Sequence, residues 1–189
     1  MKVLISVAIL AFLVITGVSG VNGLVRQDED VNAAWAQVQN QYQRRMDLIP
    51  NLVAAVKGYA AHEKQTLQAV IEARANATKV SVNLDNVKEV QEYMQAQSGI
   101  SSALSRLMAV AENYPDLKAN QNFLSLQDQL EGTENRIAVA RKDYIAVVKS
   151  FNQNARTFPG IIWAMLSGLK AKPVFDAAPN AQTAPIVSF

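Results

Sequence analysis

The feature that most constrains the fold is an uncharged apolar run at residues 3–25, VLISVAILAFLVITGVSGVNGLV. A helix of this length, at about 1.5 Å of rise per residue, can cross a hydrocarbon core of about 30 Å. The competing interpretation is a cleaved signal peptide, with Lys2 as its positive start and residues 18–20 as a small-residue cleavage site. Because the apolar character continues past that site to Val25, we expect a transmembrane anchor over residues 1–25.

The charges around the apolar run leave its orientation in the membrane open. Lys2 precedes the run, and Arg26, Arg44 and Arg45 follow it. Acidic residues count little in the positive-inside rule, so residues 28–30 do not decide the question. The sequence therefore predicts a single-pass membrane protein whose soluble part could lie on either side.

The remaining composition argues against several classes of active site. The chain has no cysteine, which excludes thiolate chemistry, and His62 is its one histidine, without a partner at metal-ligand spacing. No Gly-rich phosphate loop or Gly-x-Ser-x-Gly motif is present. The 18 Lys and Arg residues against 16 Asp and Glu form no basic block, which argues against nucleic-acid binding. We therefore expect no catalytic, cofactor-binding or metal site and no enzyme activity.

Beyond the apolar run, apolar residues recur with helical spacing almost everywhere. In the clearest stripe the steps alternate between three and four, as in a coiled coil; its members are Phe123, Leu126, Leu130, Thr133, Ile137, Ala140, Tyr144, Val147 and Phe151. Three further stripes are Val31, Trp35, Val38, Tyr42, Arg45 and Ile49; Leu52, Val56, Tyr59, Glu63, Thr66 and Val70; and Val87, Val90, Met94, Gln97, Ser101, Leu104, Met108 and Ala111. These stripes predict an all-α fold over residues 26–171, an antiparallel four-helix bundle of long, partly kinked helices.

Polar segments and prolines predict where these helices end. Residues 78–85 join the third stripe to the fourth, with Asp85 as the expected N-cap. Pro115 ends the fourth helix, and residues 158–160 end the long heptad helix before a short apolar segment. The small and polar residues 97–102 predict close helix approach or local looseness within the fourth helix.

Arg45 and Glu63 are the sharpest polar candidates, because each falls where its stripe expects an apolar residue. On one continuous helix the 18 residues between them would span roughly 27 Å, so they cannot pair with each other. Each needs a partner from another helix, because an unpaired buried charge is strongly destabilising. The acidic candidates for Arg45 are Glu112 and Glu134, and the basic candidates for Glu63 are Arg106 and Arg141. These charges could fix the helix register or line a polar groove for a partner.

Pro50 interrupts the helical pattern shortly after Arg44 and Arg45. A proline in a helix interior costs roughly 3 kcal/mol, because it removes a donor and clashes with the preceding turn. Asp47 could cap a new helix with Pro50 in its first turn, or one helix could continue through Pro50 with a kink. We expect Arg45 to be buried and Arg44 to face water, lipid headgroups or a neighbouring subunit.

Several motifs together resemble the LemA family. In chain order they are RRMDLIPNLV, VKGYAAHE, EARANA, LSRLMAVAENYPDLKANQNF and LEGTENRIAVARKDY. The resemblance extends to the N-terminal apolar segment and to the closing PIVSF. The chain departs from the family at Ile145, where the family often has asparagine.

The resemblance implies a single-pass protein of the bacterial inner membrane, with an N-terminal transmembrane helix followed by a four-helix bundle. It favours a short N-terminus outside and a cytoplasmic bundle. It implies no established catalytic site and no cofactor, and some relatives are linked to the formation of magnetosome membranes. We therefore expect a membrane-organising scaffold in contact with the lipid bilayer, and the small residues Gly17, Gly20 and Gly23 favour homo-oligomers.

An adaptor for a membrane-protein partner, such as a protease or a transporter, is the alternative function. Residues 172–189 contain three prolines and predict an extended tail, with Phe175 and Phe189 as candidate anchors. This tail, or a groove near Arg45 and Glu63, would hold the partner.

Overall fold

The computed structural model describes residues 1–60 and 62–174, so the expected anchors Phe175 and Phe189 lie outside the described residues. Within these residues the regular structure is helical, with no strand, and the all-α prediction is confirmed. The helices are α1 (Lys2–Tyr59), α2 (Lys64–Lys79), α3 (Val87–Ala111), α4 (Pro115–Lys118), α5 (Gln121–Arg156) and α6 (Gly160–Ser167).

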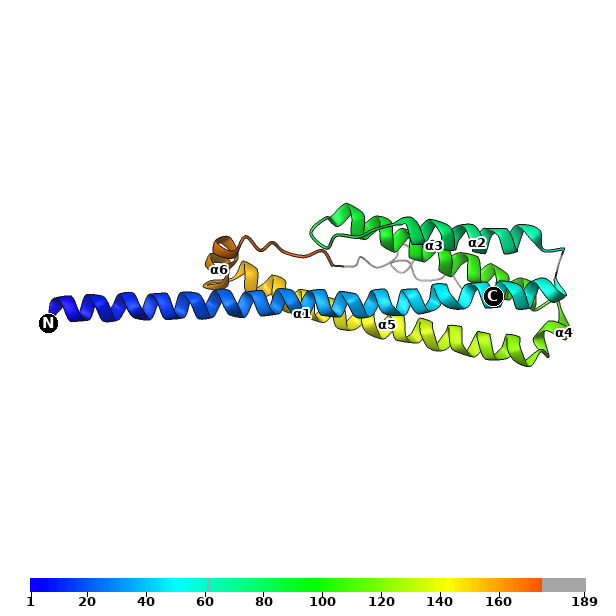
Figure 1. Ribbon diagram of the computed structural model, residues 1–189, viewed down its shortest axis with the longest axis horizontal. Coiled ribbons are helices and arrows are strands. Elements are labelled where there is room, and N and C mark those ends of the chain that lie inside the picture. Colours follow the sequence, from blue (N-terminus) through cyan, green and yellow to red (C-terminus); the bar gives the residue numbers. More distant parts are fainter. Residues whose placement is uncertain (61, 175–189) are drawn as a thin grey trace, which may run out of the picture.

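The second half of α1 forms a bundle with α2, α3 and α5, and the apolar first part of α1 projects from one end (Figure 1). Helices α1 and α3 run away from the projecting part, and α2 and α5 run back toward it. Helix α1 packs mainly against α5, and α2 packs mainly against α3. We call the end with the α1–α2 turn and α4 the distal end, and the end nearest α6 the proximal end.

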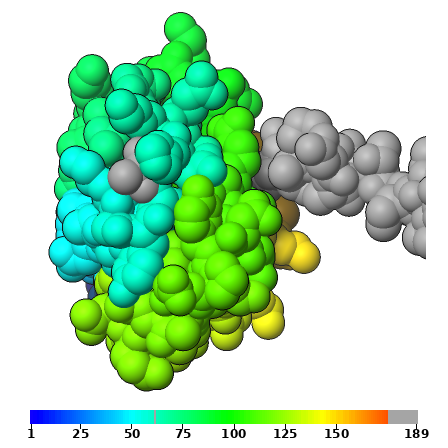
Figure 2. All heavy atoms as spheres, turned by 90° about the vertical axis from the view of Figure 1, so that its right-hand side faces the viewer, coloured from blue at the N-terminus to red at the C-terminus, as the bar shows by residue number. Residues whose placement is uncertain are grey.

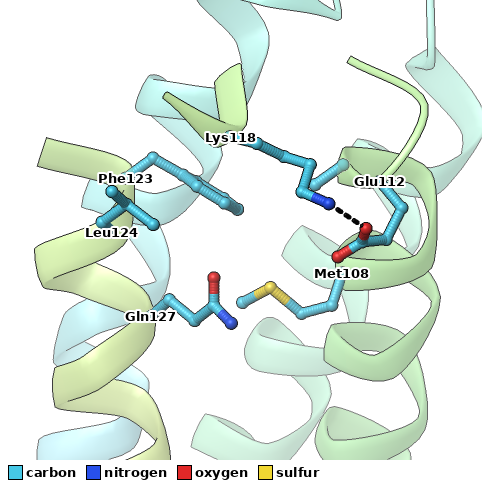
Figure 3. A pocket seen from close by; sticks show the side chains of 7 residues that line it. Met108, Glu112, Lys118, Phe123, Leu124 and Gln127 are labelled. Carbon is cyan, nitrogen blue, oxygen red and sulfur yellow. Dashed lines mark hydrogen bonds and ion pairs between the residues drawn. The ribbon is translucent and has the colours of Figure 1, made fainter. Parts of the chain in front are cut away.

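The distal end is closed by short connections. Seen from that end, the end of α1 and the start of α2 adjoin α3, α4 and the start of α5 in one continuous surface (Figure 2). A small pocket of about 50 Å³ lies there between α3 and α5 (Figure 3). Glu112 on its rim forms an ion pair with Lys118 of α4, so Glu112 is not the partner of Arg45.

Buried apolar residues form two clusters along the bundle. The distal core contains Met46, Ile49, Leu52, Val56, Ala60, Leu67, Val70, Ala77, Ile100, Ala103, Leu104, Leu107, Ala111, Leu117, Phe123 and Leu130. The proximal core contains Leu24, Val31, Trp35, Val38, Tyr42, Leu84, Val90, Tyr93, Ile137, Tyr144, Val148, Phe151, Ala155 and Ala164. Three buried polar residues, Arg45, Gln97 and Thr133, each lie between a distal-core and a proximal-core residue of the same helix.

Helix α1 is a single helix of 58 residues that continues through Pro50. The alternative in which Asp47 caps a new helix is therefore wrong; Asp47 is exposed and accepts a hydrogen bond from Gln43 Nε2 at 2.7 Å. Because proline has no N–H, the carbonyl of Met46 loses its partner within the helix. Arg74 of α2 replaces that partner, since its Nε donates a hydrogen bond to Met46 O at 2.9 Å.

Two predicted features of the connections are wrong. The third stripe was expected on one helix, but α1 ends at Tyr59 and α2 begins at Lys64, so the chain reverses direction before Glu63. The N-cap of α3 is Asn86 rather than Asp85, because the Asn86 side chain accepts the hydrogen bond from the Lys88 N–H at 3.1 Å.

Helix α3 also continues without a break through residues 97–102. A Cβ atom at Gly99 would meet no atom within 4 Å, so no neighbouring helix lies against this exposed glycine.

Candidate functional site

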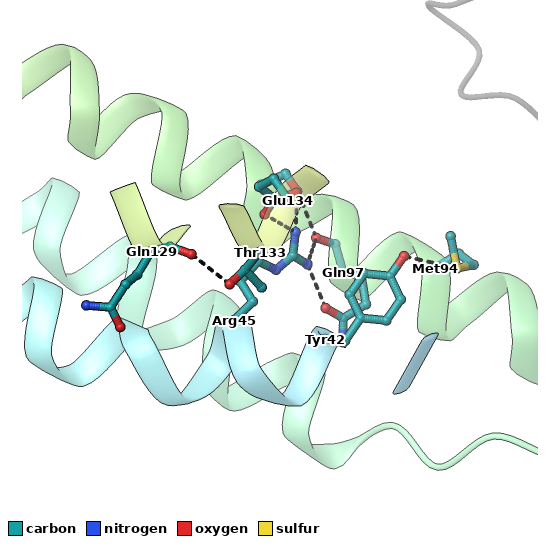
Figure 4. Close-up of polar contacts among 8 residues, drawn as sticks. Tyr42, Arg45, Met94, Gln97, Gln129, Thr133 and Glu134 are labelled. Atoms are coloured by element: carbon teal, nitrogen blue, oxygen red, sulfur yellow. Dashed lines mark hydrogen bonds and ion pairs between the residues drawn. The ribbon is translucent and has the colours of Figure 1, made fainter. Parts of the chain in front are cut away.

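Arg45 lies near the middle of the bundle with its side chain 1% exposed. The alternating spacing of the α1 stripe directs it inward with Tyr42 and Ile49, which are also buried. Its Nη1 donates hydrogen bonds to Glu134 Oε1 and to Ser101 Oγ, each at 2.8 Å. Its Nη2 donates to Gln97 Oε1 at 2.7 Å and to Gln97 O at 3.0 Å. The expected pairing with Glu134 is therefore found, and one guanidinium joins α1, α3 and α5 (Figure 4).

The Tyr42 ring and the two cores surround this guanidinium. The Arg45 Cζ atom lies 5.1 Å from the centre of the Tyr42 ring, a distance suited to a cation–π contact. Burial raises the pKa of Tyr42, although Arg141 and Arg45 act to lower it, so this hydroxyl stays protonated at neutral pH. Among the described residues, Arg45 Nε and Gln97 Nε2 have no hydrogen-bond partner. The guanidinium is thus held by several hydrogen bonds in a buried position, where the loss of its partners would be strongly destabilising.

Glu134 connects this buried charge to the surface. Its side chain is 42% exposed, whereas that of Arg45 is almost inaccessible. Glu134 lines an open groove of about 580 Å³ between α3 and α5, together with Ser101, Ser105, Leu104, Met108, Gln127, Leu130 and Glu131. The groove therefore has a carboxylate at one wall and an apolar floor, and Arg45 lies behind it.

Glu63 does not occupy the buried position that its stripe predicted. It is half-buried at the start of α2, where its Oε1 accepts a hydrogen bond from Tyr114 Oη at 3.1 Å. That bond raises the pKa of Tyr114. The expected ion pair with Arg106 or Arg141 is not found among residues 1–60 and 62–174, because the turn at the distal end removes Glu63 from the helical stripe. Arg141 lies instead near Tyr42, and Arg106 is exposed.

The other predicted residues lie on the surface. Arg44 is exposed, in agreement with its expected position on the flank of the helix. Pro50 is exposed on α1 as well, and its main effect is the free carbonyl that Arg74 binds. Within the described part of the chain, no group of three or more His, Cys, Asp or Glu side chains is arranged to hold a metal ion.

A second polar cluster, at the proximal end, was not among the predicted residues. We call Asp28, Asp85, Asn152 and Lys172 the Lys172 clamp. Lys172 Nζ lies 2.9 Å from Asp28 Oδ1 and 2.7 Å from Asp85 Oδ1. The backbone N–H of Lys172 donates to Asn152 Oδ1 at 2.8 Å, and its carbonyl accepts from Asn152 Nδ2 at 2.8 Å. The clamp ties the chain after α6 to α1, to the α2–α3 connection and to α5.

Lys172 remains charged in the clamp although it is buried. Burial acts to lower its pKa, but hydrogen bonds and charges of Asp85 and Asp28 outweigh it, so the pKa is raised. Asp28 could have been found from sequence, because it precedes Val31 by three residues and so extends the α1 stripe toward the N-terminus. Lys172 lies in a segment without helical spacing and carries no such signal.

The chain is similar to known proteins along most of its length. The model of the LemA family matches residues 34–189. Magnetosome protein MamQ 2 of Paramagnetospirillum magneticum AMB-1 is 26% identical over 186 residues, covering 88% of this chain and 68% of that protein. Magnetosome protein MamQ of Magnetospirillum gryphiswaldense is 25% identical over an alignment of 203 residues, covering 97% and 74%. Protein LemA of Metamycoplasma hominis is 26% identical over 137 residues, covering 72% and 60%.

Proposed function

The chain belongs to the LemA family, and on this premise we propose that it is a non-enzymatic scaffold whose bundle is held at a membrane by its own N-terminal helix. One observation carries the proposal. Helix α1 runs without interruption from the apolar run to the distal end of the bundle. The same helix supplies Trp35, Tyr42 and Ile49 to the cores, so the bundle cannot rotate or tilt independently of its anchor.

The apolar part of α1 has the properties of a membrane span. It passes the length and hydropathy criteria for crossing a bilayer, and its most apolar stretch is not buried within the chain. A signal sequence would meet the same criteria. Cleavage after Gly20, however, would remove Gly17 and Gly20, and the ring of Trp163 lies against both of these glycines. This contact favours a retained anchor.

A scaffold of this kind would work as an oligomer. Gly17 and Gly20 contact Trp163 of the same chain, whereas a Cβ atom at Gly23 would meet nothing within 4 Å. Two of the three glycines expected to favour oligomers are therefore covered within the chain, and the exposed apolar residues 3–15 of α1 are the surface on which a second chain would pack. Two of the relatives compared above are named magnetosome proteins, which is consistent with the expectation that some relatives take part in forming magnetosome membranes.

The mass of the full chain in a membrane mimic tests the proposal. We expect the protein, extracted in mild detergent and then placed in nanodiscs, to have a mass well above 20.6 kDa after correction for detergent and lipid. Light scattering or native mass spectrometry gives that mass. A strictly monomeric chain in both environments would contradict the oligomeric scaffold.

The groove between α3 and α5 supports a second candidate function, an adaptor for a membrane-protein partner. It is open, lined by Leu104, Met108 and Leu130, and bordered by Glu134. Such an adaptor would hold its partner with this groove or with the tail, and removal of residues 175–189 tests the tail, because this truncation keeps the Lys172 clamp. If captured partners disappear while the melting temperature stays unchanged, the tail binds a partner. If the melting temperature falls instead, the tail belongs to the fold.

A further inference from the structure

Helix α6 exposes most of its large apolar side chains. Phe158, just before it, is 81% exposed, and Met165 and Leu166 are 80% and 71% exposed. Ile161 and Ile162 are also exposed, and Ala164 is the one buried residue of this helix. A contiguous apolar surface of this kind on a protein usually meets another protein or a membrane.

The position of α6 along α1 indicates what covers this surface. Its Trp163 lies against Gly17 and Gly20, so α6 is docked on the last turns of the apolar run (Figure 1). A hydrocarbon core of about 30 Å takes about 20 helical residues, so a span that starts at Val3 ends near residue 22. Gly17 and Gly20 then lie within about 8 Å of the edge of the hydrocarbon, and α6 lies at the same level.

The residues around α6 suit the membrane–water boundary. Tryptophan is enriched at that level, because its ring is apolar and its N–H is polar. Arg156 precedes α6, Lys170 follows it, and both are exposed. Positive side chains next to an apolar face favour contact with phosphate headgroups. The exposed acidic residues Glu29 and Asp30 lie further along α1, beyond the edge of the hydrocarbon.

We propose that α6 is a second membrane contact, which lies along the bilayer surface beside the span without crossing it. Phe158, Met165 and Leu166 enter the outer acyl chains, and Trp163 fills the space between α6 and the two glycines of α1. The inference rests on the proposed anchoring by α1. With two contacts at different points, the bundle is fixed in height and tilt relative to the membrane.

Lipid explains the exposed face better than a soluble protein partner does. The face is continuous with the apolar surface of α1, which is itself exposed over residues 1–15. A soluble protein partner covering α6 at this level would have to lie partly within the bilayer. The Lys172 clamp, which follows α6 directly, attaches the end of this segment to the bundle and so keeps α6 close to α1.

Site-specific fluorescence in lipid vesicles tests the proposal. The chain has no cysteine, so Met165→Cys gives a single site for an environment-sensitive dye. Val139→Cys on α5 is the matched control, because Val139 is an apolar side chain that is 55% exposed on the bundle. The full chain is reconstituted into phosphatidylcholine–phosphatidylglycerol vesicles that carry a spin label near the headgroup end of the acyl chains.

We expect the dye at position 165 to emit at shorter wavelength and to be quenched several-fold more than the dye at position 139. Flotation of the same vesicles distinguishes failure of the α6 contact from failure of the α1 anchor. If the chain floats with the vesicles but both dyes behave as in water, the proposal for α6 is overturned and the anchor stands. If the dye at position 165 is protected from lipid and the unlabelled Met165→Cys variant forms disulfide-linked dimers, a second copy covers α6 and the proposal is wrong. A chain that does not float overturns both.

Intrinsic fluorescence gives a second readout without a dye. Trp35→Phe leaves Trp163 as the one tryptophan, and Trp163→Phe leaves Trp35, which is buried in the proximal core. Brominated lipids should quench Trp163 strongly and Trp35 hardly at all. Equal quenching of the two tryptophans would contradict the proposal, whatever the effect of the cysteine substitutions on folding.

Discussion

The distal core is aliphatic and is closed by short turns, whereas the proximal core is aromatic and is closed by the chain that returns after α6. In the proximal core the Trp35 ring lies 5.6 Å from that of Tyr93 and 5.4 Å from that of Tyr144. The ring centres of Tyr42 and Tyr93 lie 5.7 Å apart, and the two rings meet edge to face. Among the buried residues of the distal core, Phe123 is the one aromatic side chain.

The two ends differ also in how far apart along the chain their contacts lie. The distal core uses residues 46–130, and neighbouring helices there are joined by short connections. The proximal end is held by the Lys172 clamp, whose residues lie between positions 28 and 172 of the chain. The proximal end of the bundle therefore depends on segments far apart in the sequence, and the hydrogen bonds of Arg45 connect it to a more local distal core.

The largest effect is expected from Arg45→Ala, which affects both cores. Loss of the guanidinium removes its bonds to Glu134, Gln97 and Ser101 and leaves a cavity between the cores. We expect the free energy of unfolding to fall by at least about 2 kcal/mol. Chemical denaturation of the full chain in micelles, followed by circular dichroism, measures it. Arg44→Ala should change it by less than about 0.5 kcal/mol, and equal small effects would mean that Arg45 is not buried.

Lys172→Met should loosen the proximal end and leave the distal end unchanged. It removes the cation that neutralises Asp28, whose side chain is 14% exposed, whereas Asp85 is 59% exposed and can be hydrated. We expect a loss of about 1–2 kcal/mol, less than for a fully buried pair because water screens Asp85. Hydrogen exchange should accelerate around Tyr144 and Phe151, and not around Leu52 and Leu107. Lys170→Met is the matched control, since Lys170 is exposed.

The stabilisation that Lys172 provides should depend on pH. Because the pKa of Lys172 is raised above its ordinary value of 10.5, the folded state holds this proton more tightly than the unfolded state does. The contribution of Lys172 is therefore fully present below that ordinary value and is lost as the pH rises through the folded pKa. The difference in melting temperature between the native chain and Lys172→Met should stay constant from about pH 7 to 9 and shrink at higher pH. A difference that shrinks already near pH 8 would contradict the clamp.

An effect of similar size, confined to the distal half, is expected where Arg74 donates to the carbonyl that Pro50 leaves free. Arg74→Ala should cost about 1–2 kcal/mol, because the half-buried carbonyl of Met46 then has no donor. In the Pro50→Ala background the backbone N–H of residue 50 can donate to Met46 O, so Arg74→Ala should cost about 1 kcal/mol less. Additive effects in this double-mutant cycle would show that the two features are independent.

The smallest change in stability is expected at the contact between α1 and α6. A Cβ atom at Gly20 would clash with the Trp163 ring, whereas one at Gly23 meets nothing. Gly20→Ala should displace Trp163 and shift its fluorescence, with a change in stability below about 1 kcal/mol because α6 can move. Gly23→Ala gains the same helix propensity and should leave the spectrum unchanged. Identical spectra for both variants would mean that α6 is not docked on Gly20.

The sequence predicted those parts of the molecule that have helical periodicity. The α1 stripe and the long heptad stripe of α5 are found in the cores, and Glu134, one of the two predicted candidates, pairs with Arg45. Glu63 was misplaced because the reversal after Tyr59 coincides with an intact three–four spacing. Pro50 identifies the carbonyl of Met46 as an acceptor without a partner in its helix, but no pattern in the sequence indicates that Arg74 of α2 donates to it. Lys172 and Trp163 contact residues far away in the sequence, and a periodic pattern carries no information on such pairs.

A scaffold held at the membrane by α1 requires this helix to be one rigid rod from the membrane to the bundle. Val14 in the apolar run and Arg44 in the bundle are both exposed and 30 residues apart. Spin labels at Val14→Cys and Arg44→Cys, measured in nanodiscs by double electron–electron resonance, should give a narrow distance distribution near about 45 Å, at about 1.5 Å for each residue. A broad distribution, or one centred well below that distance, would show a hinge between anchor and bundle and would contradict the account.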